Sequence, residues 1–235
     1  DDHVLLFVTH HIVSDFWSLV VMMADLQKIY ALEAEGSLPS AFAEYDDYVR
    51  WETDFLDGPA GDRLWDYWRE ELAGRLPLLN LPTDHSFPTQ PTDAGSIVNF
   101  ALEDDLSKGL RQLAKSQGTT LFALLLAAYQ VLLYRYSGQD DVLVGSPAAC
   151  RGRREFEELV GYVANMVVFR GDLSENPKFC DFLQQARRKV IQGIEHQEFP
   201  FSLLVERLQP ERSSGRPPLF QAAFLMERSH RAEAQ

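Results

Sequence analysis

Residues 4–18 read VLLFVTHHIVSDFWS, an apolar run that ends in two adjacent histidines and reaches an aspartate four residues after the second one. The β-branched and aromatic content of Val4–Thr9 predicts a buried strand. The apolar pattern from Ser14 or Asp15 to Tyr30 predicts a helix. The sequence therefore places His10 and His11 at the point where a strand ends and a helix is about to begin.

A histidine in this position is a candidate general base. Imidazole titrates near neutral pH, so His11 can accept a proton from an incoming amine or hydroxyl. Asp15, near the helix start, can meet the helix dipole, orient a histidine ring or pair with a distant arginine. On this motif alone, the alternative is that both histidines are structural core residues.

The rest of the chain predicts a mixture of helices and strands. Helices are expected at Glu44–Leu56, Asp62–Leu72, an amphipathic stretch ending at Gln117, an almost wholly apolar stretch from a Thr119 or Thr120 cap to Tyr136, Phe179–Glu195, and Pro200–Pro210. Strands are expected at Ile97–Leu102, Asp141–Ser146, Val163–Arg170 and Phe220–Met226. The elements neither alternate strictly nor repeat, so we predict an α/β fold of the two-layer α+β type, a sheet-and-helix sandwich rather than a barrel or solenoid.

Prolines at 77, 82, 88 and 91 interrupt the pattern between the predicted helices and the second group of strands. Proline cannot continue a helix or a central strand, so this stretch is interpreted as a linker between two lobes. The predicted organisation is a first lobe at 1–88 that carries the histidine motif, a linker at 89–95, and a second lobe at 96–235.

Composition excludes several classes of function. The chain of 235 residues has 22 Lys and Arg against 35 Asp and Glu, a formal charge of −13, so a nucleic-acid partner is not expected. Its two cysteines, Cys150 and Cys180, form no paired motif, which fits a reducing, cytoplasmic location. The longest apolar run, Leu121–Tyr129, is too short to span a membrane.

Neither a metal site nor a covalent acyl-enzyme is expected, because the sequence contains no cluster of metal ligands and no nucleophile elbow.

Five segments together resemble one known family, the condensation domains of nonribosomal peptide synthetases, in the acyltransferase superfamily that includes chloramphenicol acetyltransferase. Residues 9–18 look like the family's HHxxxDG motif and residues 45–51 (YDDYVRW) like its YxDYAxW motif. The later matches are 160–170 (VGYVANMVVFR), 196–201 (HQEFPF) and 212–221 (RSSGRPPLFQ), which resemble VGxFVNT, HQDxPF and RDxSRxPLF. Their shared order makes the resemblance more specific than any one motif.

The resemblance implies a chloramphenicol acetyltransferase-like pseudo-dimer of two lobes in a V, here incomplete, with a substrate tunnel between them. Substrates arrive on the phosphopantetheine arms of upstream and downstream carrier proteins, in a larger chain with adjacent synthetase domains; no directly bound cofactor, nucleic acid or membrane is expected. An amide then forms between an acyl or peptidyl thioester and an aminoacyl amine. The expected catalytic residues are His11, His10 and Asp15, with Arg151 and Phe16 in structural or orienting roles and Asn165, Ser146 and Trp17 near the tunnel. Arg151 is the expected ion-pair partner of Asp15.

The sequence departs from the family pattern at Phe16, which stands where glycine is usual, and at Ala164-Asn165-Met166 and Arg212-Ser213. A benzyl group beside His11 occupies volume that a substrate can require. Two alternatives therefore stay open beside amide formation. One is an ester-forming acyltransferase of the same superfamily, and the other is a catalytically silent module that recruits partners.

Overall fold

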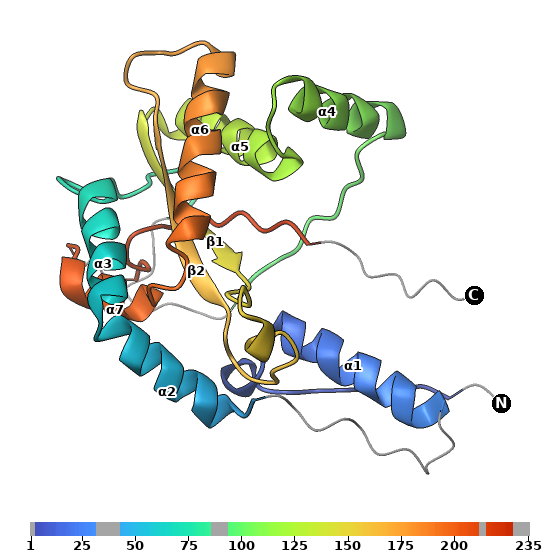
Figure 1. Ribbon diagram of the computed structural model, residues 1–235. Helices are drawn as coiled ribbons and strands as arrows, with labels where there is room; N and C mark the ends of the chain where they lie inside the picture. The colour runs from blue at the N-terminus through green and yellow to red at the C-terminus, as the bar shows by residue number, and fades with distance from the viewer. Residues whose placement is uncertain (1–2, 32–42, 86–93, 212–214, 228–235) are drawn as a thin grey trace. The chain divides into compact units, whose positions relative to one another are not determined.

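The computed structural model describes residues 3–31, 43–85, 94–211 and 215–227 (Figure 1). By its contacts the chain divides into two compact units, Asp1–Asp66 with Ala148–Asn165, and Tyr67–Pro147 with Met166–Gln235. This division differs from the predicted lobes at 1–88 and 96–235, because residues 148–165 group with the first segment. The lobes expected of an intact domain stay a prediction, and the linker at 89–95 falls mostly outside the described residues.

The first unit is helical. It contains a 3₁₀ turn η1 (His11–Val13), helices α1 (Phe16–Ala31) and α2 (Tyr45–Leu56), the start of α3 (Pro59–Glu71), and a second 3₁₀ turn η2 (Arg154–Phe156). Its aromatic centre joins α2 to η2, because the Phe156 ring lies 5.3 Å from the rings of both Tyr48 and Trp51. Packing of this kind brings residues 148–165 against a segment about a hundred positions earlier in the chain.

The second unit contains the sheet. Strands β1 (Asp141–Ala148) and β2 (Asn165–Asp172) pair with each other, and Gly145 forms an isolated parallel bridge with Ala223. The helices are α4 (Asp104–Ser116), α5 (Leu121–Ser137), α6 (Phe179–Glu195) and α7 (Phe201–Leu208). The central residues of both strands are buried, which agrees with their near-continuous apolar sequence.

Helix α5 is the apolar helix that the sequence predicts, and the structure confirms its cap. Thr120 Oγ1 accepts a hydrogen bond from the Ala123 N–H at 3.1 Å, and Gly138 ends the helix with a φ of 69°. Helix α5 packs against α6, and its buried Gln130 donates to the carbonyl oxygen of Phe169 in β2 at 3.2 Å. The helix therefore covers the sheet, and the layered mixed fold expected from the sequence is confirmed.

Three predicted strands are wrong. Residues 4–9 and 97–102 form no strand, and 220–226 contribute only the bridge at Ala223. A strand needs a neighbour to satisfy its backbone groups, and neither of the first two segments pairs with any described residue. Their apolar side chains are accordingly exposed: Val4 is 95% exposed and Ile97 is 85% exposed.

The predicted helices are confirmed, with α3 beginning at Pro59 rather than Asp62. Leu64, Trp68 and Leu72 are buried, whereas Tyr45 and Val49 of α2 are 40% and 43% exposed. No single helix in the described ranges is both long and apolar enough to cross a membrane. Helices α4 and α5 pass that test only as a pair, bent by 104° at their junction.

Candidate active site

The histidine motif forms a tight turn rather than the end of a strand. His10 caps η1, because its Nδ1 accepts a hydrogen bond from the Ile12 N–H at 3.1 Å. His11 is the first residue of η1, and its side chain is exposed. The two histidines therefore differ: His10 holds the turn through its hydrogen bond to Ile12, whereas His11 has an exposed ring.

The tautomer of His11 follows from its hydrogen bond. Its Nδ1 lies 2.8 Å from the carbonyl oxygen of Ser14. A carbonyl oxygen can only accept, so Nδ1 of the neutral ring carries the hydrogen and Nε2 keeps its lone pair. This local contact therefore leaves Nε2 as the basic nitrogen, which is the arrangement that a general base requires.

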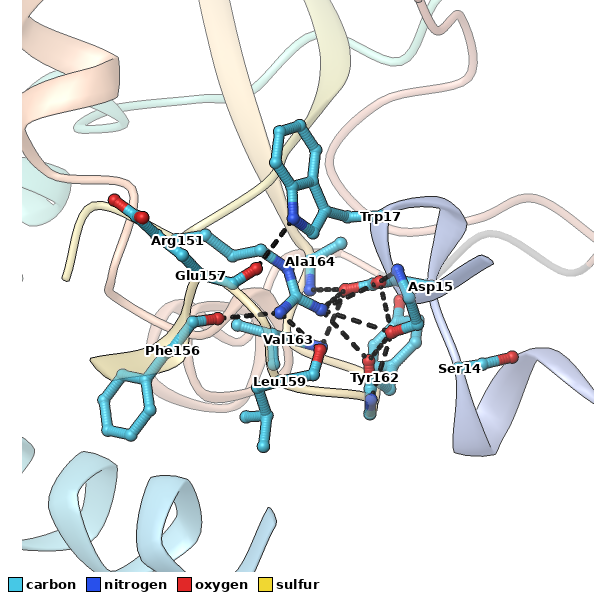
Figure 2. Close-up of polar contacts among 12 residues, drawn as sticks. Ser14, Asp15, Trp17, Arg151, Phe156, Glu157, Leu159, Tyr162, Val163 and Ala164 are labelled. Atoms are coloured by element: carbon cyan, nitrogen blue, oxygen red, sulfur yellow. Dashed lines mark hydrogen bonds and ion pairs between the residues drawn. The ribbon is translucent and has the colours of Figure 1, made fainter. Parts of the chain in front are cut away.

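Asp15 and Arg151 form a buried ion pair in the first unit (Figure 2). Arg151 Nη2 lies 3.0 Å from both carboxylate oxygens of Asp15, and the two side chains are 3% and 2% exposed. The predicted pairing of these residues is confirmed. Their roles in catalysis stay a prediction.

The carboxylate of Asp15 also organises the backbone around it. The N–H groups of Ser18, Val163 and Ala164 donate to it at 2.8, 3.1 and 3.1 Å, and the Ser18 hydroxyl lies 2.7 Å from Oδ1. Burial acts to raise the pKa of Asp15, but the hydrogen bonds from Ser18, the charge of Arg151 and the Val163 N–H outweigh it, so the pKa lies below its ordinary value. A carboxylate held in this way stays ionised and serves as an anchor.

Arg151 binds backbone as well as Asp15 (Figure 2). Its Nη1 donates to the carbonyl oxygens of Phe156 and Leu159 at 2.9 and 2.7 Å, and its buried Nε has no partner among the described residues. Cys150, the residue before it, has a φ of 51°, a left-handed conformation that is uncommon outside glycine. This turn after β1 directs the guanidinium inward, where it closes the loop of residues 151–164 on itself.

The other predicted site residues lie on three different elements, α1, β1 and β2. Phe16 is the first residue of α1 and is 50% exposed; it is not one of the described non-glycine residues with positive φ, so the backbone at this position does not require glycine. Trp17 is 38% exposed and donates from Nε1 to the Glu157 carbonyl oxygen at 2.8 Å (Figure 2). Asn165 begins β2, and Ser146 is buried in β1 in the second unit. The predicted tunnel that these residues would line stays a prediction.

Several motif residues have packing or capping contacts. Asp47 forms a capping box with Glu44 at the start of α2, and the Trp51 ring stacks on Phe55 at 5.1 Å. His196 stacks on Tyr67 at 3.8 Å, and Pro200 is the N-cap of α7. These contacts give the four residues structural roles.

Sequence reasoning missed Tyr162, whose ring lies 5.2 Å from that of His11 at an interplanar angle of 73°. It occupies a position that the VGxFVNT pattern leaves unspecified, so the sequence carries no signal for it. Within the described ranges, no group of three or more His, Cys, Asp or Glu side chains is arranged to hold a metal ion.

The chain matches one family of known proteins over its whole length. A model of the condensation domain family matches residues 1–235. One component of the linear gramicidin synthase of Brevibacillus parabrevis is 41% identical over 229 residues, which are 96% of this chain and 4% of that protein. Malpinin synthetase of Mortierella alpina is 38% identical over 227 residues, which are 95% of this chain and 3% of that protein.

Solved structures agree on the fold. The four-domain nonribosomal peptide synthetase holo-AB3403 has a TM-score of 0.82 at 27% identity, covering 93% of this chain and 16% of that one. The X-domain from teicoplanin biosynthesis has a TM-score of 0.81 at 27% identity, covering 91% of this chain and 49% of that one.

Fold and site together define a protein with the chloramphenicol acetyltransferase-like fold. More specifically, the chain belongs to the condensation domain family of nonribosomal peptide synthetases. Condensation domains of these synthetases are generally acyltransferases with a role in peptide bond formation. The chain spans 4% or less of the two curated relatives described above, and about half of the X-domain structure.

Proposed function

We propose that this chain supplies the catalytic base of a condensation reaction in which an amide forms between two carrier-bound substrates. The donor is an acyl or peptidyl thioester from an upstream carrier protein, and the acceptor is the amine of an aminoacyl thioester on a downstream one. The observation that carries the proposal is the hydrogen bond between His11 Nδ1 and the Ser14 carbonyl oxygen. In the neutral ring this bond leaves Nε2 unprotonated, and the side chain is exposed.

In the proposed reaction, His11 carries one proton from the attacking amine to the departing sulfur. The acceptor nitrogen attacks the thioester carbonyl carbon while His11 Nε2 takes the proton that the amine loses. The carbon–sulfur bond then breaks, and the departing sulfur receives a proton from His11, which returns to its neutral form. The phosphopantetheine thiol of the donor carrier protein is thereby released, and the product stays on the acceptor carrier protein.

Asp15 and Arg151 support this chemistry without touching the substrate. Both are buried, and the Asp15 carboxylate already accepts hydrogen bonds from five groups, so neither is available to exchange protons with a substrate. His10 holds the turn through Ile12. We infer that His11 alone does the proton transfer and that the other motif residues hold it in place.

The test is amide formation by the full-length protein that carries this chain, with an acyl-loaded donor and an aminoacyl-loaded acceptor carrier protein. His11→Ala is expected to lower the rate about 10²- to 10⁴-fold, the usual contribution of a general base. His85→Ala, at an exposed histidine that follows α3 in the chain, is the matched control and is expected to keep the wild-type rate.

The same assay separates the open alternatives. A hydroxyacyl acceptor offered beside the aminoacyl one shows whether the product is an ester. No product from either acceptor, with the carriers correctly loaded, would indicate a silent module. Full turnover by a folded His11→Ala protein would remove His11 from the mechanism.

A further inference from the structure

Tyr162 is the aromatic side chain that contacts His11. The two ring centroids are 5.2 Å apart with an interplanar angle of 73°, an edge-to-face arrangement. We propose that Tyr162 is a positioning residue: its ring fixes the orientation of the His11 imidazole so that Nδ1 faces Ser14 and Nε2 faces the substrate. The inference rests on the proposed role of His11 as the base.

His11 needs such a restraint because its ring is exposed and a single torsion can turn it. The ring is held by a hydrogen bond between Nδ1 and the Ser14 carbonyl oxygen, at 2.8 Å. Rotation of an imidazole about its last torsion has broad minima, so without a packing partner the ring can turn out of the plane in which Nδ1 meets the Ser14 carbonyl oxygen. A ring turned out of that plane loses its hydrogen bond to Ser14, and the tautomer with the hydrogen on Nδ1 is then no longer selected.

The backbone that carries Tyr162 is fixed on both sides. Before it, the Gly161 N–H donates to the Ser18 hydroxyl oxygen at 3.0 Å. After it, the Val163 N–H donates to the Asp15 carboxylate at 3.1 Å. The Asp15–Arg151 ion pair is therefore linked to His11 in two ways: by the backbone between residues 11 and 15, and by the segment 161–163 that carries the Tyr162 ring.

Tyr45 adds a further contact to the same peptide group. Its hydroxyl donates to the Tyr162 carbonyl oxygen at 3.0 Å. Because this carbonyl oxygen and the N–H groups of Gly161 and Val163 are all hydrogen-bonded, the Tyr162 ring has a defined place beside His11 even though the residue is 42% exposed. A rigid support of this kind is what a positioning residue needs.

Removal of the Tyr162 ring is expected to have a modest effect, and to lower kcat rather than raise KM. An edge-to-face pair contributes enough to favour one ring orientation by about two- to tenfold, so removing the Tyr162 ring is expected to lower kcat by about that factor. KM for the two loaded carrier proteins is expected to stay the same, because the change acts on the fraction of His11 that is correctly oriented.

The experiment compares Tyr162→Leu, which removes the ring, with Tyr162→Phe, which keeps it. In the full-length protein, Tyr162→Leu is expected to lose kcat about two- to tenfold, and Tyr162→Phe to recover it to within about twofold of wild type. Tyr30→Leu, at an 87% exposed tyrosine on α1, is the matched control for loss of a tyrosine ring. Equal losses in Tyr162→Leu and Tyr162→Phe would assign the role to the hydroxyl and overturn the proposal.

A second readout does not depend on any reaction. In the 235-residue chain labelled with ¹⁵N-histidine, the His11 ring nitrogens, assigned by their loss in His11→Gln, report the tautomer directly. Wild type and Tyr162→Phe are expected to show a protonated Nδ1, and Tyr162→Leu a mixture of tautomers. An unchanged His11 spectrum in Tyr162→Leu would overturn the proposal even if the protein proves to form no amide, whereas loss of amide formation alone would count only against the proposed function.

Discussion

Arg151 Nη2 is equidistant, at 3.0 Å, from the two carboxylate oxygens of Asp15, across 136 positions of sequence. Both side chains are almost wholly buried, and each also binds backbone groups of residues 156–164. The pair therefore joins the start of α1 to the loop that follows β1. Because His11 is four residues before Asp15, the same pair sets where the proposed base lies relative to that loop.

Asp15→Asn is expected to destabilise the protein strongly. It leaves Arg151 as a buried charge without a counter-ion, at a cost of about 3 to 5 kcal/mol in the free energy of unfolding. The amide that replaces the carboxylate also has only one accepting oxygen, so it cannot satisfy every N–H that donates to Asp15. Urea unfolding followed by circular dichroism measures the effect.

The control for this variant is Asp25→Asn on α1. Asp25 pairs with Lys28 at 3.0 Å, but the two side chains are 34% and 51% exposed, so the loss is expected to stay below about 1 kcal/mol. An Asp15→Asn protein that is as stable as wild type but inactive would assign Asp15 a direct part in the reaction and would contradict its role as an anchor.

Low pH is expected to remove the contribution of Asp15 to the free energy of unfolding. Its pKa in the folded protein lies below the ordinary value of 3.8, so its contribution to stability is fully present well above pH 3.8 and is lost as the pH falls through the folded value. Wild type and Asp15→Asn compared at pH 7, 5, 4 and 3 isolate this one group. The gap between their unfolding free energies is expected to stay constant from pH 7 to 5 and to narrow below pH 4.

Sequence reasoning identified the helices and the buried pair because both have local or motif-based signals. The apolar periodicity of Phe179–Glu195 predicts α6 to the residue, and the cap at Thr120 predicts the start of α5. Asp15 lies in the histidine motif, and Arg151 lies in the basic segment 151–154 just before the VGxFVNT-like segment, so the two could be predicted to pair.

The wrongly predicted strand and the missed site residue also have a physical explanation. The apolar run at Val4–Thr9 has the composition of a strand, but composition does not supply the neighbour with which a strand must pair. Tyr162 was missed for a related reason. Its contact with His11 depends on a loop that is held by hydrogen bonds to backbone groups. Every residue type has these backbone groups, so the sequence does not indicate such contacts.

His10→Ala is expected to have a smaller effect than His11→Ala. The Ile12 N–H loses its acceptor, and a lost cap of this kind typically costs about 1 kcal/mol. His10→Asn supplies a side-chain oxygen that can accept the same hydrogen bond, so it is expected to recover most of the stability and of the amide-forming rate. Thermal unfolding and turnover measured on both variants check this. A loss in His10→Asn as large as that in His11→Ala would give His10 a catalytic part.

Phe16→Gly tests whether the benzyl group restricts the acyl donor. Phe16 is 50% exposed at the first position of α1, so trimming it is expected to broaden acceptance of longer or branched acyl thioesters. Glycine in a helix costs up to about 1 kcal/mol of stability. Competition between short and long donors in one reaction measures the selectivity. The same donor ratio in wild type and Phe16→Gly would refute the steric account.

Gly161 lies against Tyr45, and the contact leaves no room for a side chain. A Cβ atom built on Gly161 falls 2.2 Å from Cδ2 of the Tyr45 ring, far inside contact distance. Tyr45 is 40% exposed, so its ring can move outward, but the movement breaks its hydrogen bond to the Tyr162 carbonyl oxygen.

Gly161→Ala is therefore expected to cost about 1 to 3 kcal/mol in the free energy of unfolding, through overpacking and the lost hydrogen bond. Gly152→Ala is the matched control, because nothing lies within 4 Å of a Cβ there, and it is expected to leave stability within about 0.5 kcal/mol of wild type. If the Tyr45 ring is the obstacle, Tyr45→Ala and the double variant with Gly161→Ala should be equally stable, since the alanine then has space. Additive losses in the double variant would show that Gly161 is required for its backbone conformation and not for the space that it leaves to Tyr45.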